Sequence, residues 1–398
     1  MCQLKSGIIL KNMVFVPEYD SHTDMLEELG IEDNYLNASK TFVRVELSPK
    51  DADVFSDIDT WELNVDQDIL PDWYDEEIYK PQVVEAVKAW AKYHIHIGVN
   101  NLTIIEGKNH YIKDCKDVHI YGSATVENIC GSATVENICD SATVKNICDN
   151  ATVEYIYGNA TVKNICGNAT VENICDSATV RNIRDSATVE YIYGSATVRN
   201  IRDNATVRNI CDRATVEYIY GSATVKNICG NATVKYIYGS ATVRNICGNA
   251  TVRNIRDSAT VEYIYGNATV ENIRDNATVE YICGSATVKN ICDNATVRNI
   301  CDSATVEYIY GSATVEYIYG SATVKNICGN ATVKNIYDNV TVENAAGFAT
   351  IIGSPYGWRK NSILILSENA TFKDCRTKTI YQAGDWKLVN VKEGVINE

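Results

Sequence analysis

Proline, tryptophan and phenylalanine are scarce in this chain of 398 residues, and they are unevenly distributed. The chain has five of each, and all of them lie outside residues 122–346. That segment therefore has to build any core from small and medium side chains. The change in composition predicts a domain boundary at each end of the segment, in a chain longer than one ordinary domain.

Long apolar runs are missing as well. No stretch of about 18 apolar residues is present, so no transmembrane helix is predicted. The N-terminal sequence MCQLKSGIIL has a short apolar run but neither the h-region nor the cleavage site of a secretory signal. Fifteen Cys would suit a secreted disulfide scaffold, but here most of them recur with a repeat, which favours reduced thiols. We therefore expect a soluble cytoplasmic protein that does not contact a membrane.

The segment 122–346 consists of 25 copies of a nine-residue unit that reads [GD]-[SN]-A-T-V-[EKR]-[NY]-I-[CYR]. Thr at position four and Val at position five occur in every copy, and position one is always Gly or Asp. Ala at position three and Ile at position eight are each replaced once, by Val340 and Ala345. Position two is Ser or Asn except at Arg213. Such a fixed short period is the signature of a repeat architecture.

The fixed positions predict a mainly β fold, a parallel β-solenoid. Ala-Thr-Val alternates between the inside and the outside of a strand, Ile adds a second buried anchor, and Gly/Asp followed by Ser/Asn is typical of turns. One unit cannot close a coil, so each coil takes either two units or three. We favour two units, an 18-residue coil, because Ala, Val and Ile suit a thin core between two sheets. At ~4.8 Å per coil the array would be a rod of roughly 60 Å, and its stability should grow with repeat number.

Four regions are predicted. Residues 1–100 form a small α+β head domain, 101–121 an N-terminal solenoid cap, 122–346 the array, and 347–398 a C-terminal β cap whose bulky Phe, Trp and Leu close the core. The elements expected in the head are a hairpin at 5–16, a helix at 21–30, strands at 42–49 and 60–66, and a helix that begins with Pro at 81–91. The sequence HIHIG then leads into the solenoid.

Two segments of the head domain are similar to a known group of proteins. Its sequences MCQLKSGIIL and VDQDILPDWY are similar to the opening domain of uncharacterised β-solenoid repeat proteins from gut bacteria and their phages. The resemblance covers about a quarter of the chain and implies a phage or prophage setting, but it implies no activity.

Three positions of the repeat vary. Position six is Glu in 12 copies, Lys in seven and Arg in six; position seven is Asn in 17 and Tyr in eight; position nine is Cys in 12, Tyr in eight, Arg in four and Ala in one. The alternatives at each position are related by single-base codon changes, which indicates a recently duplicated DNA repeat. The variation fits drift on a solvated surface, which we favour, or a modular display surface.

An 18-residue coil would place odd-numbered repeats on one face and even-numbered repeats on the other. All four position-nine Arg then fall on the odd face, and five of the eight position-seven Tyr fall on the even face. Stacked Arg side chains repel one another unless they are solvated or bridged by an anion, so the Arg181–Arg202 cluster is the best candidate for a phosphate contact. The candidate binding residues are Arg181, Arg184, Arg199, Arg202, Arg253, Arg256, Tyr155, Tyr191, Tyr263, Tyr281 and Tyr317.

The cysteines do not predict a metal site. Cys130 with Cys148, and Cys283 with Cys301, would be neighbours in ladders, but a structural zinc site needs four converging ligands. The nine-residue period resembles that of the calcium-binding β-rolls of secreted toxins. The array lacks the second Gly and the Asp of their GGxGxD turns, so the resemblance covers the period alone. We expect neither a metal nor another cofactor.

Cys2 is a weak candidate for a catalytic nucleophile. Removal of the initiator methionine would make it N-terminal, which resembles class II amidotransferases and abasic-site-processing proteins that begin MCG. Residue three here is Gln3, so the motif ends after two letters. His22, His94 and His96 are the side chains that would activate the thiol. We favour an ordinary second residue and no enzymatic activity.

The first functional hypothesis is a structural or interaction protein, in which a rigid rod displays variable residues and the head domain or the faces bind a protein partner. One alternative is a nucleic-acid-directed or anti-defence protein, either a DNA binder or a DNA mimic like the pentapeptide-repeat solenoids. The array has 18 basic and 23 acidic residues, and this near balance disfavours a mimic, which needs a sustained anionic surface. The other alternative is an enzyme that uses Cys2.

Overall fold

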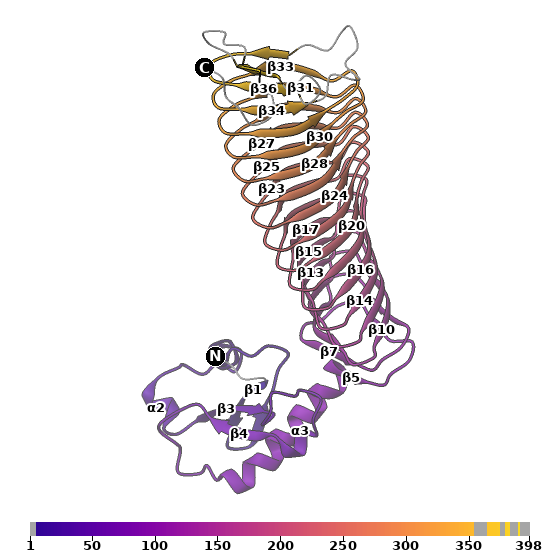
Figure 1. Cartoon of the computed structure of the whole chain (residues 1–398). Coiled ribbons are helices and arrows are strands. Elements are labelled where there is room, and N and C mark those ends of the chain that lie inside the picture. The colour runs from indigo at the N-terminus through magenta and orange to yellow at the C-terminus, as the bar shows by residue number, and fades with distance from the viewer. Residues whose placement is uncertain (1–4, 354–363, 375–378, 383–388, 391–398) are drawn as a thin grey trace.

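The computed structural model describes the chain except residues 1–4, 354–363, 375–378, 383–388 and 391–398. A small head domain lies at one end of a long rod built from stacked coils (Figure 1). The structure is mainly β, with 48% strand and 9% helix, and its solenoid has about 15 turns of ~18 residues. The predicted fold class and the predicted coil length are therefore confirmed.

The head domain is a four-stranded antiparallel sheet, in the order β2-β1-β3-β4, with helix α3 packed against it. Ile9, Val43 and Val45 of the sheet share a buried cluster with Val87 and Trp90 of the helix. The predicted hairpin, the helix capped by Ser and both strands are present. The elements are β1 (Lys5–Leu10), β2 (Met13–Phe15), α1 (His22–Glu28), α2 (Tyr35–Ala38), β3 (Phe42–Ser48), η1 (Ile58–Thr60), β4 (Glu62–Val65) and α3 (Glu76–His94).

The predicted start of the second helix at Pro81 is wrong. Helix α3 begins at Glu76, and Asp75 is its N-cap, whose carboxylate accepts the backbone N–H of Glu77. Acidic side chains in the first turn also complement the positive end of the helix dipole. The acidic residues before Pro81 therefore supply the start signal, and the proline lies inside the helix.

The solenoid has two parallel sheets that take alternate strands of the chain. In the odd sheet, β5 (Ile95–Ile97) and β7 (His110–Lys113) precede β9 (Thr125–Cys130), and the order continues through every odd strand to β35. In the even sheet, β6 (Thr103–Ile104) and β8 (Val118–Ile120) precede β10 (Thr134–Ile138), and the order continues through every even strand to β36. From β10 to β33 (Thr341–Ala345), each strand has five residues and starts nine residues after the preceding one.

The register of both sheets is exact at two repeats per coil. Thr134 pairs with Thr152, and Ile138 pairs with Ile156, so every residue stacks on its equivalent in the next coil. The Ala, Val and Ile of successive repeats form one continuous buried cluster from Ile104 to Phe372. Each coil therefore shields the apolar row of its neighbours, as a solenoid requires.

The turns explain why position one is Gly or Asp. In every repeat the residue at this position has a positive φ, a conformation that glycine adopts freely and aspartate tolerates. A Cβ added to Gly158 would lie 3.1 Å from the backbone N of Asp140 in the preceding coil. An aspartate at this position makes a hydrogen bond to the preceding coil. The Asp149 carboxylate accepts the backbone N–H of Gly131, one coil earlier, at 3.0 Å. Nine equivalent bonds link other coils.

The far end of the solenoid departs from the repeat. Phe372 is buried at the end of the core, and Leu366 and Tyr381 pack against the cluster. Strand β37 turns back antiparallel onto β36, and β38 pairs with β37. The predicted cap residues Trp358 and Trp386 lie outside the described residues. The last strands are β34 (Thr350–Gly353), β35 (Leu364–Leu366), β36 (Thr371–Asp374), β37 (Thr379–Gln382) and β38 (Val389–Asn390).

Replacing Asp149 separates the two roles of a turn aspartate. Asp149→Gly loses the bond to Gly131 but keeps the turn conformation, whereas Asp149→Ala also has to hold a positive φ, at an extra cost of about 1–2 kcal/mol. We expect the thermal unfolding midpoint to fall less for the glycine variant than for the alanine variant. Equal midpoints for the two variants would show that backbone conformation does not select residues at position one.

Candidate interaction surfaces

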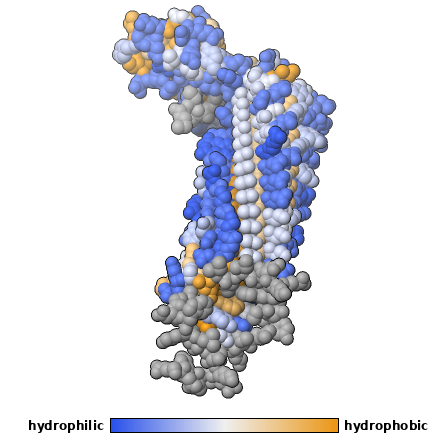
Figure 2. Space-filling model, turned by 90° about the horizontal axis from the view of Figure 1, so that it is seen from above, coloured by the Kyte–Doolittle hydropathy of each residue, from blue (hydrophilic) through white to orange (hydrophobic). Residues whose placement is uncertain are grey.

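Every position of the repeat forms a ladder that runs parallel to the long axis of the rod, because equivalent residues stack at each coil. Figure 2 shows these ladders as straight ranks of like-coloured side chains. The odd sheet carries the odd-numbered repeats and the even sheet carries the even-numbered ones. The neighbours of a side chain within its ladder are therefore the equivalent residues of the coils before and after it.

Position seven carries asparagine ladders, which sequence reasoning missed. On the odd sheet the Nδ2 of Asn146 donates to the Oδ1 of Asn128 at 2.9 Å, and Asn164 donates to Asn146 at the same distance. Asn182 and Asn200 continue the chain of bonds at 2.8 and 2.9 Å. Stacked amides of this kind stabilise in-register sheets. Asparagine therefore has a structural role at position seven. Its recurrence in 17 of the 25 repeats is the feature of the sequence that could have revealed this role.

The five tyrosines predicted for the even face all lie on the even sheet. Only Tyr263 and Tyr281 fall in successive coils, and their rings stack with centroids 5.0 Å apart. Tyr155 and Tyr191 are separated from each other by an asparagine coil, and Tyr317 stacks instead on Tyr337, with centroids 6.5 Å apart. The even face is therefore not a continuous aromatic surface.

The odd sheet holds a second aromatic group that was not singled out from the sequence. Tyr218 stacks on Tyr236 and Tyr220 stacks on Tyr238, with centroids 5.4 and 5.0 Å apart. The guanidinium of Arg256 lies 4.9 Å from the ring centre of Tyr238. The predicted binding residue Arg256 is thus held in a cation–π contact within the chain itself.

The predicted arginine cluster lies in two adjacent strands of the odd sheet, β15 (Thr179–Ile183) and β17 (Thr197–Ile201), and in the turns that follow them. Arg184 and Arg202 each pair with the aspartate that follows them, at 3.4 and 3.1 Å. Arg199 pairs with Glu217 at 3.6 Å. Among the described residues, Arg181 is the one member of the cluster that makes no ion pair. Carboxylates of the chain thus occupy much of the predicted phosphate site. The outlying Arg253 likewise pairs with Glu271.

The predicted thiol neighbours are close together. A hydrogen bond with Cys130 raises the pKa of Cys148 to about 11, and burial raises the pKa of Cys283 to about 11. The ligand atoms of Cys283, Cys301 and Asp302 lie within 4.8 Å of one another. His22, Glu46 and Asp66 form a second such group in the head domain. Each group has three ligands where a structural zinc site has four, so we assign a metal to neither.

Three histidines meet where the head domain joins the solenoid. His94 ends α3, His96 lies on β5 and His110 lies on β7; the rings of His94 and His110 are 5.1 Å apart, and those of His96 and His110 are 5.7 Å apart. Burial lowers the pKa of all three, that of His96 to about 4. His94 also stacks on Trp90 and lies 2.7 Å from the Glu18 carboxylate. The head and the first coils are therefore packed together through uncharged imidazoles at neutral pH.

A buried lysine lies beside this cluster. The Lys5 ammonium pairs with Asp20 at 2.6 Å and lies 5.0 Å from the ring centre of Trp90. Its positive charge opposes protonation of His94. Asp20 also accepts a bond from Asn109, in the loop before β7. This network ties the first strand of the head to the first coils of the solenoid.

The proposed nucleophile Cys2 lies outside the described residues. Of the three histidines named as its partners, His94 and His96 belong to the junction cluster. His22 lies elsewhere in the head domain, where its ring contacts the Val45 carbonyl and the Asp66 carboxylate. The structure does not group the three candidate bases around a single point.

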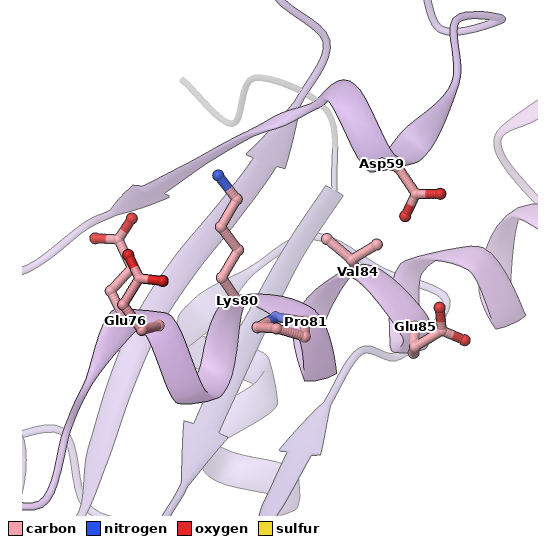
Figure 3. A pocket seen from close by; sticks show the side chains of 7 residues that line it. Asp59, Glu76, Lys80, Pro81, Val84 and Glu85 are labelled. Atoms are coloured by element: carbon pink, nitrogen blue, oxygen red, sulfur yellow. The ribbon is translucent and has the colours of Figure 1, made fainter.

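A hollow of about 400 Å³ lies beside the first turns of α3. Figure 3 shows Glu76, Lys80 and Glu85 on the helix and Asp59 opposite them, with charged groups that point in different directions. Asp59 is engaged by Lys88 at 2.7 Å. These groups do not converge on a point where a small substrate or an ion would be held.

Comparison with known proteins gives no match to a family model, a curated protein or a solved structure. Among the described helices, none has both the length and the apolar character needed to cross a bilayer.

The histidine junction should loosen in acid. The folded-state pKa values lie below the ordinary value near 6.5, so the open junction binds more protons than the closed one between pH 6.5 and about 4, and closure weakens as the pH falls through that window. We expect amides of α3, β5 and β7 to lose protection by about tenfold from pH 7 to pH 5 in hydrogen exchange corrected for the intrinsic rate.

His96→Gln removes one titrating group and should reduce this pH dependence. His119→Gln, on β8 outside the cluster, is the matched control and should leave it unchanged. A pH dependence that is the same in both variants would show that His96 does not contribute.

Proposed function

We propose that this chain is a non-enzymatic structural and interaction protein, in which the solenoid is a rigid rod and a protein partner binds to the head domain or to the faces of the rod. The observation that carries the proposal is the single continuous core, which runs through every coil from Ile104 to Phe372. A rod of this kind holds whatever its ends and faces bind at a fixed separation.

The surface chemistry supports display rather than catalysis. The ladders present the same residue types at one-coil intervals, and Asn, Tyr and turn-Asp contacts hold them in place. The charged groups of the hollow beside α3 diverge. The arginines that would contact a nucleic acid are largely paired with carboxylates of the chain, which favours a protein partner over DNA.

We place the protein in the cytoplasm, and in a phage or prophage setting, as part of the same proposal. The thirteen described cysteines are all unpaired, although many of them stack in adjacent coils, and this fits a reducing compartment. The phage setting rests on the resemblance of the head-domain sequences alone.

Shortening the rod tests its role as a spacer. Deletion of residues 221–292 removes eight repeats, or four coils, and rejoins a turn to a turn. The maximum dimension from small-angle X-ray scattering should fall by about 19 Å, at ~4.8 Å per coil, while the circular dichroism of a β protein persists. A shortened chain with an unchanged dimension would contradict the rod.

Variants of the full chain then separate the functional alternatives. Cys2→Ala should capture the same partner proteins as the unmodified chain, since no catalytic thiol is involved. Loss of capture or of phenotype in Cys2→Ala would favour the enzyme. Salt-sensitive binding of duplex DNA in a band-shift assay, lost in an Arg181→Ala/Arg199→Ala variant, would favour the nucleic-acid binder.

A further inference from the structure

Position six carries a charged residue in every repeat, and successive coils of one sheet pair many of these residues where the signs alternate. Lys145 pairs with Glu127 at 2.6 Å on the odd sheet, and Lys334 pairs with Glu316 at 3.3 Å on the even sheet. The spacing of one strand brings such residues within reach, and these pairs link coils along the axis. Eight further ion pairs of this kind occur along the two sheets.

Two long runs break this alternation. The odd sheet carries four successive basic residues and the even sheet carries four successive acidic ones. The two runs are Lys145, Lys163, Arg181 and Arg199, and Glu136, Glu154, Glu172 and Glu190. Within the described structure, the two inner residues of each run make no ion pair. Stacking like charges at this spacing is unfavourable, and the outer residues of each run are paired with residues beyond the run, so the uncompensated charge is confined to the middle of each run.

The two runs lie at the same level of the rod on opposite sheets, because each acidic residue precedes a basic residue by nine positions, or half a coil. The same relation extends along the array. Pairing each even-sheet residue at position six with the odd-sheet residue nine positions later gives opposite signs in nine of twelve coils. The exceptions are Lys226 with Lys235, Arg244 with Arg253, and Glu262 with Glu271.

These opposite charges cannot meet within one molecule, since the Ala, Val and Ile core separates the two sheets. They can meet between molecules. Both ladders repeat at one strand spacing, so the odd face of one rod matches the even face of another coil by coil. A parallel alignment keeps all twelve coils in contact, whereas an antiparallel alignment that opposes the two runs leaves the other eight coils of each rod without a partner.

We propose that copies of this chain associate side by side and in parallel, with the odd face of one rod against the even face of the next. The partner of the faces is thus a second copy, an inference that rests on the proposed function and makes it more specific. The contact uses two different surfaces, so it does not close on itself, and it leads to open lateral arrays of rods. The head domain lies toward one end of the rod, which leaves the faces of the later coils open (Figure 1).

Charge reversal in the full chain tests the contact. Lys145→Glu/Lys163→Glu/Arg181→Glu/Arg199→Glu makes both faces of these coils acidic, and Glu136→Lys/Glu154→Lys/Glu172→Lys/Glu190→Lys makes both basic. In sedimentation velocity at about 50 mM salt, where screening is weak, the unmodified chain should associate and each variant alone should be monomeric. An equimolar mixture of the two variants should associate again, and about 1 M salt should dissociate it.

A pair of variants with the same change in net charge distinguishes the effect of the charge pattern on association from the effect of net charge. Lys163→Glu/Arg181→Glu and Lys226→Glu/Arg244→Glu change the net charge equally, but the first removes two complementary coils and the second creates two. The first should weaken association by about tenfold or more, and the second should strengthen it. Equal shifts in the same direction would overturn the proposal.

A monomeric unmodified chain would also overturn it. Scattering on the same samples reports the rod dimension, so a monomeric rod of the expected length refutes the lateral contact and leaves the structural role standing. A compact particle refutes the structural role itself.

Discussion

The rest of the structure depends on one constraint, the exact stacking of each residue on its equivalent in the next coil. Parallel strands in perfect register let the Ala, Val and Ile of every coil cover those of its neighbours, so a core of small side chains excludes water along the whole rod. The same register aligns side chains outside the core. It makes asparagine amides bond in a row, tyrosine rings stack, and turn aspartates reach the backbone of the preceding coil.

Much of this architecture could be predicted, because the fixed apolar positions of the repeat mark the side chains that face inward and its variable polar positions mark those that face outward. The invariant Thr-Val pair indicates a strand, and Gly or Asp at position one indicates a turn with a positive φ. The coil length followed from the size of the core residues. The start of α3 could not be found in the same way, because two start signals compete there: the acidic cap at Asp75 comes before the more conspicuous Pro81 and is the one the helix uses.

The surfaces were harder to predict, because their properties depend on pairs of residues rather than on single ones. Arg184 and Arg202 look like free cations in the sequence, yet each is held by the aspartate that follows it. Asparagine at position seven looks like a tolerated polar residue until the register shows amide bonded to amide. The histidine junction joins residues from the last turn of α3 and from two strands of the odd sheet. The spacing of these histidines in the sequence does not predict that their rings lie close together.

The length of the unit, half a coil, has a consequence for how such a chain can change. Both sheets are built from the same Ala, Thr, Val and Ile, so the core cannot distinguish one sheet from the other. Gain or loss of one unit during replication would leave the core intact but would move every residue beyond that point to the opposite sheet. A change by two units would keep each residue on its side. The parity of the copy number therefore decides which residues lie on each outer face of the molecule beyond that point, while the Ala, Val and Ile core stays the same.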